Sequence, residues 1–72
     1  VTVTFHGNGG TPSVSSVTVP KDTALGGQIA TAAREDHNFL GWNTAMDGSG
    51  SAFTSNTIVT DNITVYAQWH RR

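Results

Sequence analysis

The absence of cysteine is the feature that most constrains how this 72-residue chain can fold. A domain of this size buries only about 60% of the surface that its unfolded chain exposes, so its stability is marginal. Many small domains compensate with disulfides or a thiolate metal site, and a chain without thiols can form neither. Two Trp, three Phe and one Tyr, together with β-branched residues, therefore have to supply the core.

The charge of the chain excludes several classes of function. Only 12% of the residues are charged, and the net charge is −1. Affinity for nucleic acid comes mainly from Lys and Arg, and this chain has four, two of them at Arg71 and Arg72. No apolar run approaches the roughly 20 residues that span a bilayer. We therefore expect neither nucleic-acid binding nor membrane insertion.

Other polar residues are mainly Thr and Ser, a composition typical of extracellular β modules. A strand pattern begins directly at Val1, which indicates a piece of a longer protein.

Period-two alternation of apolar and polar residues predicts the strands. Val1, Val3 and Phe5 alternate with threonines, and in Ile63–Trp69 every second side chain is again apolar. Further strands are predicted at positions 14–19, 38–43 and, as a short piece, 52–53. In the first of these, Val14 has the opposite parity to Val17 and Val19, so a bulge is expected near Ser15-Ser16. A helix is expected over positions 24–35, where apolar residues recur at three- and four-residue spacing: Leu25, Ile29 and Ala32 or Ala33.

Gly26 and Gly27 each cost this helix about 1 kcal/mol relative to Ala, so a start after Gly27 is an alternative. The order of elements predicts an α+β fold of the β-grasp type, a mixed sheet of about four strands with one helix packed on one face. Its first and last strands are adjacent and parallel. We expect one domain over residues 1–70, with residues 71–72 as a terminal tail or the start of a linker.

The aromatic residues are expected to be mostly core. Phe39 and Trp42 have opposite parity in their strand, so a bulge at Gly41 is expected to turn both rings inward. We expect Trp42 and Trp69 to be at least half-buried. Tyr66 lies on the opposite face from Trp69 and is the best aromatic candidate for a partner contact. The residues expected to determine the fold are Phe5, Phe39, Gly41, Trp42 and Trp69.

No motif carries catalytic, metal or cofactor chemistry. The glycines before Pro12 lack the third glycine of a dinucleotide-binding turn. The turn at positions 47–51 lacks the alternating acidic residues of a calcium loop. Glu35, Asp36 and His37 are adjacent on a helix and point about 100° apart, so they do not converge. The histidines are far apart in sequence, although parallel first and last strands could bring His6 and His70 together.

Three blocks of the sequence resemble one known family. Residues 34–42, Arg-Glu-Asp-His-Asn-Phe-Leu-Gly-Trp, resemble the signature of the Listeria–Bacteroides repeat, also called the internalin B B-repeat. The start, Val-Thr-Phe-His-Gly-Asn-Gly-Gly at 3–10, and the end, Ile-Thr-Val-Tyr-Ala-Gln-Trp at 63–69, resemble the start and end of the same repeat. The resemblance implies a ubiquitin- or SUMO-like β-grasp fold and a setting in large bacterial surface or secreted proteins, often in tandem copies.

The sequence departs from the family pattern at Ala32, where proline is usual, and at Asp36-His37, where Gly-Tyr is usual. The first change favours a longer helix, and the second puts a titratable ring, His37, at the edge of the core. His37 and Tyr66 are the candidate partner contacts.

The resemblance favours a non-catalytic extracellular repeat of a bacterial surface or secreted protein, acting as a stalk, spacer or adhesion module. Two alternatives stay open: a carbohydrate- or cell-wall-binding accessory module of a secreted hydrolase, and a host-protein-binding repeat. The expected partners are neighbouring repeats and, for the binding functions, a host surface protein or a cell-wall glycan. Contacts are expected at an exposed strand edge or on the Thr-rich sheet face. An isolated domain is expected to be a monomer without a cofactor.

Overall fold

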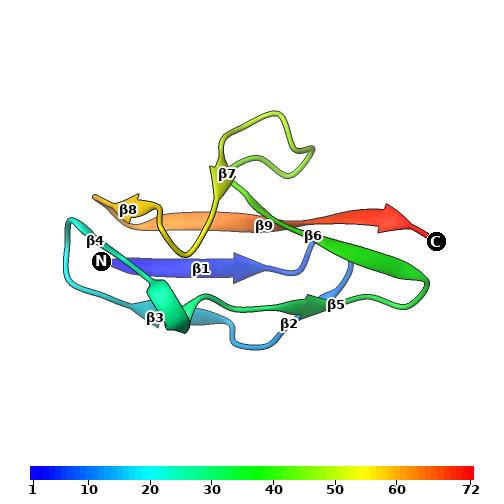
Figure 1. Cartoon of the computed structure of the whole chain (residues 1–72), viewed down its shortest axis with the longest axis horizontal. Helices are drawn as coiled ribbons and strands as arrows, with labels where there is room; N and C mark the ends of the chain where they lie inside the picture. The colour runs from blue at the N-terminus through cyan, green and yellow to red at the C-terminus, as the bar shows by residue number, and fades with distance from the viewer.

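The chain folds as an all-β structure around one five-stranded mixed sheet (Figure 1). The computed structural model describes every residue from Val1 to Arg72. The sheet has the order β3-β1-β9-β6-β7, formed by β1 (Thr2–His6), β3 (Ser16–Thr18), β6 (His37–Asn43), β7 (Ala52–Phe53) and β9 (Ile63–Arg71). Two short antiparallel ribbons accompany it, β2 (Thr11–Pro12) with β5 (Ala32–Ala33) and β4 (Thr23–Ala24) with β8 (Ile58–Val59).

The helix expected over positions 24–35 is absent, so the α+β class and the β-grasp assignment that needs a packed helix are wrong. The stretch holds only a 3-10 turn, η1 (Gly26–Gln28), between β4 and β5. Gly26 has a φ of +56°, and Ile29 is extended with a φ of −63° and a ψ of 137°. Neither conformation continues a right-handed helix. Two glycines oppose the helix, and its apolar stripe has only Leu25 and Ile29 as large side chains.

Because the backbone of this segment is extended, it can form hydrogen bonds with a distant part of the chain that it could not form as a helix. Ser13 N–H donates to the Thr31 carbonyl oxygen at 2.7 Å, and Thr31 N–H donates to Ser13 Oγ at 3.0 Å. In an α-helix these Thr31 groups would bond within the segment instead. The segment therefore stays extended, and it still buries Leu25 and Ala30 in the core.

The first and last strands lie side by side and parallel at the centre of the sheet, as expected. β3 pairs antiparallel with the other edge of β1, and β6 pairs antiparallel with the other edge of β9. Both terminal strands are therefore interior strands. The two termini lie at opposite ends of a molecule whose longest extent is 36 Å (Figure 1). β9 runs through Arg71, so the strand includes the first residue of the expected tail.

The core lies on one face of the sheet. Val3, Phe5, Val65 and Ala67 point into it from the two central strands, and each is at most 3% exposed. An aromatic row continues from there, with ring centroids 4.8 Å apart for Phe5 and Trp42, 5.3 Å for Trp42 and Phe39, and 5.5 Å for Phe39 and Trp69. Trp42 is buried and Trp69 partly buried, which agrees with the expectation for both tryptophans.

The expected bulge in β6 is confirmed at Gly41. The register with β9 shifts there, because Phe39 lies opposite Trp69 whereas Gly41 lies opposite Gln68. Gly41 has a φ of +130°, a region that glycine enters without steric cost. Phe39 therefore packs against the core on the same side as Trp42, and Leu40 is left exposed.

Candidate functional site

The face of the sheet that points away from the core is rich in hydroxyl groups. Along β1, β3 and the start of β9, buried or partly buried residues alternate with outward-facing ones. Apart from His6 at the end of β1, the outward-facing residues are Thr or Ser. Threonine suits this position because its β-branched side chain favours the strand and its hydroxyl stays solvated. The register places Thr4 between Ser16 and Thr64 and places Thr2 beside Thr18. We call this set the hydroxyl face: Thr2, Thr4, Ser16, Thr18 and Thr64.

A hollow of about 320 Å³ lies at the N-terminal end of β1 and β9. Asn62, just before β9, holds one wall in place because its Oδ1 accepts the Thr2 N–H at 2.8 Å. That bond leaves the Asn62 side-chain NH₂ free to donate outward. No buried side-chain N or O atom lacks a hydrogen-bond partner, so the free polar groups of this face contact solvent. The residues that line the hollow are Thr2, Thr4, Asn62, Ile63 and Thr64.

Two rings stand beside this hollow on the same face. His6 and Tyr66 are neighbours in the parallel pairing of β1 and β9, and their ring centroids lie 5.1 Å apart with the planes tilted by 51°. The backbone N–H of Asn8 donates to His6 Nδ1 at 3.0 Å, which orients the imidazole. Because Thr4 and Thr64 precede these residues by two positions, the rings lie about 7 Å further along the strands.

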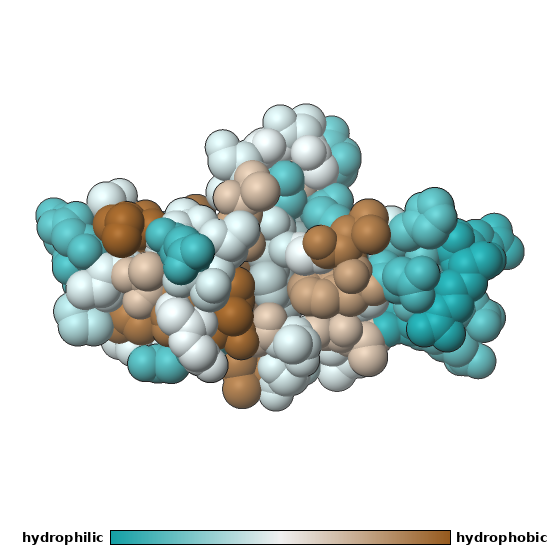
Figure 2. Space-filling view, viewed as in Figure 1, coloured by the Kyte–Doolittle hydropathy of each residue, from teal (hydrophilic) through white to brown (hydrophobic).

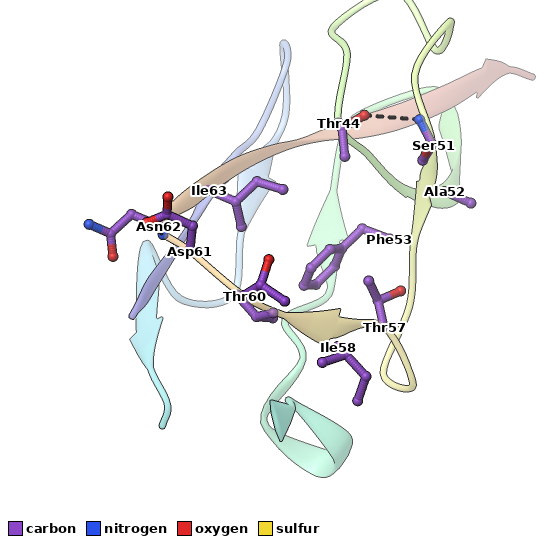
Figure 3. A pocket seen from close by; sticks show the side chains of 11 residues that line it. Thr44, Ser51, Ala52, Phe53, Thr57, Ile58, Thr60, Asp61, Asn62 and Ile63 are labelled. Atoms are coloured by element: carbon purple, nitrogen blue, oxygen red, sulfur yellow. Dashed lines mark hydrogen bonds between the residues drawn. The ribbon is translucent and has the colours of Figure 1, made fainter. Parts of the chain in front are cut away.

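A second recess, of about 170 Å³, lies between β7, β8 and the start of β9 (Figure 3). The Phe53 ring points into it from β7, with Thr60 and Ile63 on the other side. The Ser51 N–H donates to Thr44 Oγ1 at 2.9 Å across its end. Asp61 is the single titratable side chain that lines it. An acid without a neighbouring base or nucleophile does not make an acid–base catalytic site.

The two candidate contact residues do not form one site. Tyr66 lies opposite Asn43 near one end of β6, and its side chain is partly buried on the outward face. His37 lies opposite Arg71 at the other end of β6, where its Nδ1 is 2.7 Å from the carbonyl oxygen of Glu35. His37 and Asn43 are six residues apart along β6, so the two candidate residues are separated by about 20 Å along the sheet. Whether either residue contacts a partner stays a prediction.

The histidines do not gather either. His6 lies beside Tyr66, whereas His70 lies four residues further along β9 and opposite Asn38. The suggestion that His6 and His70 are neighbours is therefore wrong, because the two strand ends are not in register. No group of three or more His, Cys, Asp or Glu side chains is placed to hold a metal ion.

Charged groups are concentrated away from the hydroxyl face. Arg34, Glu35 and Asp36 precede β6, and Arg71 and Arg72 end the chain. The pairing of His37 with Arg71 brings these two charged segments together at one end of the β6–β9 pair. Figure 2 shows the most hydrophilic part of its view at the end of the molecule where the C-terminus lies. The hydroxyl face contains no Lys, Arg, Asp or Glu.

One carboxylate has a shifted pKa. Asp47 lies in the loop between β6 and β7, where the Ser49 hydroxyl donates to its Oδ1 at 2.6 Å and the Ser49 N–H donates at 3.0 Å. The side-chain bond, followed by the backbone bond, lowers the pKa of Asp47 because both favour the charged form. This arrangement stabilises the loop and offers no catalytic partner.

Sequence reasoning anticipated a Thr-rich face but missed the hollow and the pairing of His6 with Tyr66. The sequence did contain one indication of this face. Thr2, Thr4 and Thr64 alternate with the buried valines of the same strands, so they point to the opposite face of the sheet. The exact register between β1 and β9 was needed to bring these residues together.

No helix in the structure has the length and apolar character required to cross a membrane.

The chain is similar to known proteins along nearly its whole length. A family model described as the Listeria-Bacteroides repeat domain matches residues 2–68. A curated protein of Evansella cellulosilytica, described as "Putative membrane protein", is 31% identical over 67 residues, which cover 89% of this chain and 10% of that protein. The chain thus spans about a tenth of the length of this relative. No solved structure gives a match.

Proposed function

Because the chain belongs to the Listeria-Bacteroides repeat domain family, we propose that it is a non-catalytic spacer repeat of a longer bacterial surface protein. Its similarity to about a tenth of a much longer protein supports this role. In such a protein the module would lie outside the cell and continue into neighbouring repeats at both ends. Its task would be to hold other domains at a distance while remaining folded under tension.

The observation that carries the proposal is the parallel pairing of β1 with β9. Tension in a tandem array enters at the N-terminus and leaves at the C-terminus, which lie at opposite ends of the molecule (Figure 1). Such tension pulls β1 and β9 past each other along their own axes. The hydrogen bonds between them are then loaded together, whereas bonds in a peeled hairpin are loaded one at a time.

Each terminal strand is also held on its second edge. β1 lies between β9 and β3, and β9 lies between β1 and β6. The N-terminal strand receives a further contact where Val19 N–H donates to the Val1 carbonyl oxygen at 3.0 Å. Sliding either strand therefore disrupts two ladders and uncovers Val3 and Val65, which are both fully buried. This geometry suits a module that transmits force.

The role is tested by pulling tandem copies of the module end to end in a single-molecule instrument. We expect one distinct unfolding peak per copy. Each event should lengthen the tether by about 200 Å, since 72 extended residues replace a folded body 36 Å long. Extension without peaks would contradict a spacer role, because the module would then yield to the load without resistance.

A matched pair of variants sharpens this test. Phe5 N–H donates to Ser15 O on the side of β3, so the alternate N–H of Thr4 points toward β9. Thr4→Pro removes that donor, whereas Thr4→Ala removes the same exposed side chain and keeps the donor. We expect Thr4→Pro to lower the unfolding force clearly and Thr4→Ala to leave it nearly unchanged. Equal forces in the two variants would show that the β1–β9 ladder does not bear the load.

A further inference from the structure

The hollow at the N-terminal end of β1 and β9 and the His6–Tyr66 pair lie next to each other on one uncharged face. We propose that this combined surface is a binding site for a neutral polysaccharide. The site goes beyond the spacer role and does not depend on it, because no atom of the force-bearing ladder has to change for a glycan to bind.

The polar groups of the hollow match the chemistry of sugar hydroxyls. A Thr hydroxyl both donates and accepts a hydrogen bond, and so does a sugar hydroxyl. Thr4 and Thr64 face outward in one row, and the Asn62 amide is fixed by its bond to Thr2 N–H with its NH₂ free. In ligand-binding sites a few precisely placed polar groups fix the orientation of the ligand. Three threonines and one amide therefore offer several hydrogen bonds within one hollow of about 320 Å³.

The ring pair adds apolar contact at the edge of this hollow. The C–H groups of a sugar ring pack against an aromatic face, and Tyr is well suited because its hydroxyl remains solvated. Tyr66 is partly buried and backed by His6, so ordering its ring on binding costs little entropy. About 7 Å separates the rings from Thr4 and Thr64 along the strands. One extended glycan lying along β1 and β9 would contact both parts.

The charge of the surface selects a neutral ligand over the alternatives. None of the five hollow-lining residues is charged, so an ionic polymer would find no counter-ion. Asp61, next to Asn62 in the sequence, would repel a polyanion. A protein partner is also disfavoured, because Ile63 is the single apolar side chain of this surface besides the His6–Tyr66 pair, and interfaces depend on clusters of buried apolar and aromatic anchors.

The proposal is tested by recording amide NMR shifts of the 72-residue chain during titration with cellohexaose and, separately, chitohexaose. We expect at least one of these neutral oligomers to give saturable shifts with a dissociation constant below about 1 mM. The shifted amides should be those of Thr4, Asn62, Thr64 and Tyr66. The acidic oligomer hexagalacturonate should give no such response.

Variants assign the contacts. Tyr66→Ala should weaken binding at least tenfold, and the double variant Thr4→Val, Thr64→Val, which keeps side-chain shape, should weaken it at least fivefold. Tyr66→Phe, which preserves the ring and the fold, should weaken it less than threefold. Thr60→Ala, in the recess beside Phe53, should leave the affinity unchanged and serves as the matched control.

Three results would overturn the proposal. These are no saturable shift with either neutral oligomer at 10 mM, shifts confined to the Phe53 recess, or an affinity for hexagalacturonate equal to that for the neutral oligomers. The pulling experiment on tandem copies would be unaffected by any of them, so failure here is distinguishable from failure of the spacer role.

Discussion

The indole N–H of Trp42 donates to the carbonyl oxygen of Ala30 at 2.8 Å inside the core. This bond joins β6 to the extended segment that lies over the core face of the sheet, where a helix had been expected. It exists because the Ala30 carbonyl is not engaged in a helical bond. The bond therefore depends on the extended conformation that replaces the expected helix.

Trp42→Phe should destabilise the domain by about 3 kcal/mol, because it removes buried volume and leaves the Ala30 carbonyl without its partner. Trp69→Phe is the control, since its indole donates to Gly7 O at 3.0 Å at a partly buried position. We expect it to cost about 1 kcal/mol. Urea denaturation followed by the fluorescence of the remaining tryptophan measures both. Equal losses would contradict the role given to the Trp42–Ala30 bond.

Gly26→Ala distinguishes the observed turn from the expected helix by the sign of its effect. In a helix the change would stabilise the protein by about 1 kcal/mol. At a φ of +56° we expect it to destabilise by about 1 kcal/mol instead. Thermal unfolding followed by circular dichroism gives the sign, and a stabilised variant would restore the helical interpretation.

Gly41→Ala should destabilise by about 1 to 3 kcal/mol, because a φ of +130° strains any residue with a Cβ. Open space surrounds the added methyl, so the cost is one of backbone conformation alone. Gly27→Ala is the matched control, since that site is equally open and its φ is not positive. Denaturant midpoints of the two variants compare them directly. A loss in Gly41→Ala no larger than in the control would contradict the bulge.

Asp47 should titrate below its ordinary value of 3.8, because Ser49 donates two hydrogen bonds to its charged form. A pKa that is lower in the folded state contributes stability above the unfolded pKa, and this is lost as the pH falls through the folded pKa. The effect on stability is small, since the carboxylate is exposed. NMR titration of the side-chain carboxyl checks the shift. In Ser49→Ala the midpoint should rise toward the ordinary value, and an unchanged midpoint would exclude the side-chain bond as its main cause.

The strands were predictable where alternation was strict. The alternation in Val1–Phe5 and in Ile63–Trp69 identified the two central strands. The opposite parity of the two inward-facing aromatic residues of β6 identified the bulge at Gly41. The helix failed because three- and four-residue spacing is weak support when two adjacent glycines interrupt it. Hydrogen bonds from distant segments, such as that from Ser13 N–H to Thr31 O, then fixed an extended chain.

The candidate site was only partly accessible from sequence. Parity alone placed the threonines and Tyr66 on one outward face. It could not give the register that sets His6 beside Tyr66 and Thr4 beside Thr64, because pairing between residues 60 positions apart depends on the whole sheet. The hollow depends in turn on Asn62, whose bond to Thr2 N–H links the same two distant segments.

The most direct test of the load-bearing β1–β9 pair compares two pulling directions in the same protein. The chain has no cysteine, so handles can be attached at Val1→Cys with Arg72→Cys, or at Val1→Cys with Asp61→Cys. The first pair shears β1 against β9, and the second pulls both strands apart from the same end and unzips them. We predict a severalfold higher unfolding force for the first pair. An equal or lower force for the first pair would contradict the claim that the parallel pairing of the terminal strands makes this domain a spacer.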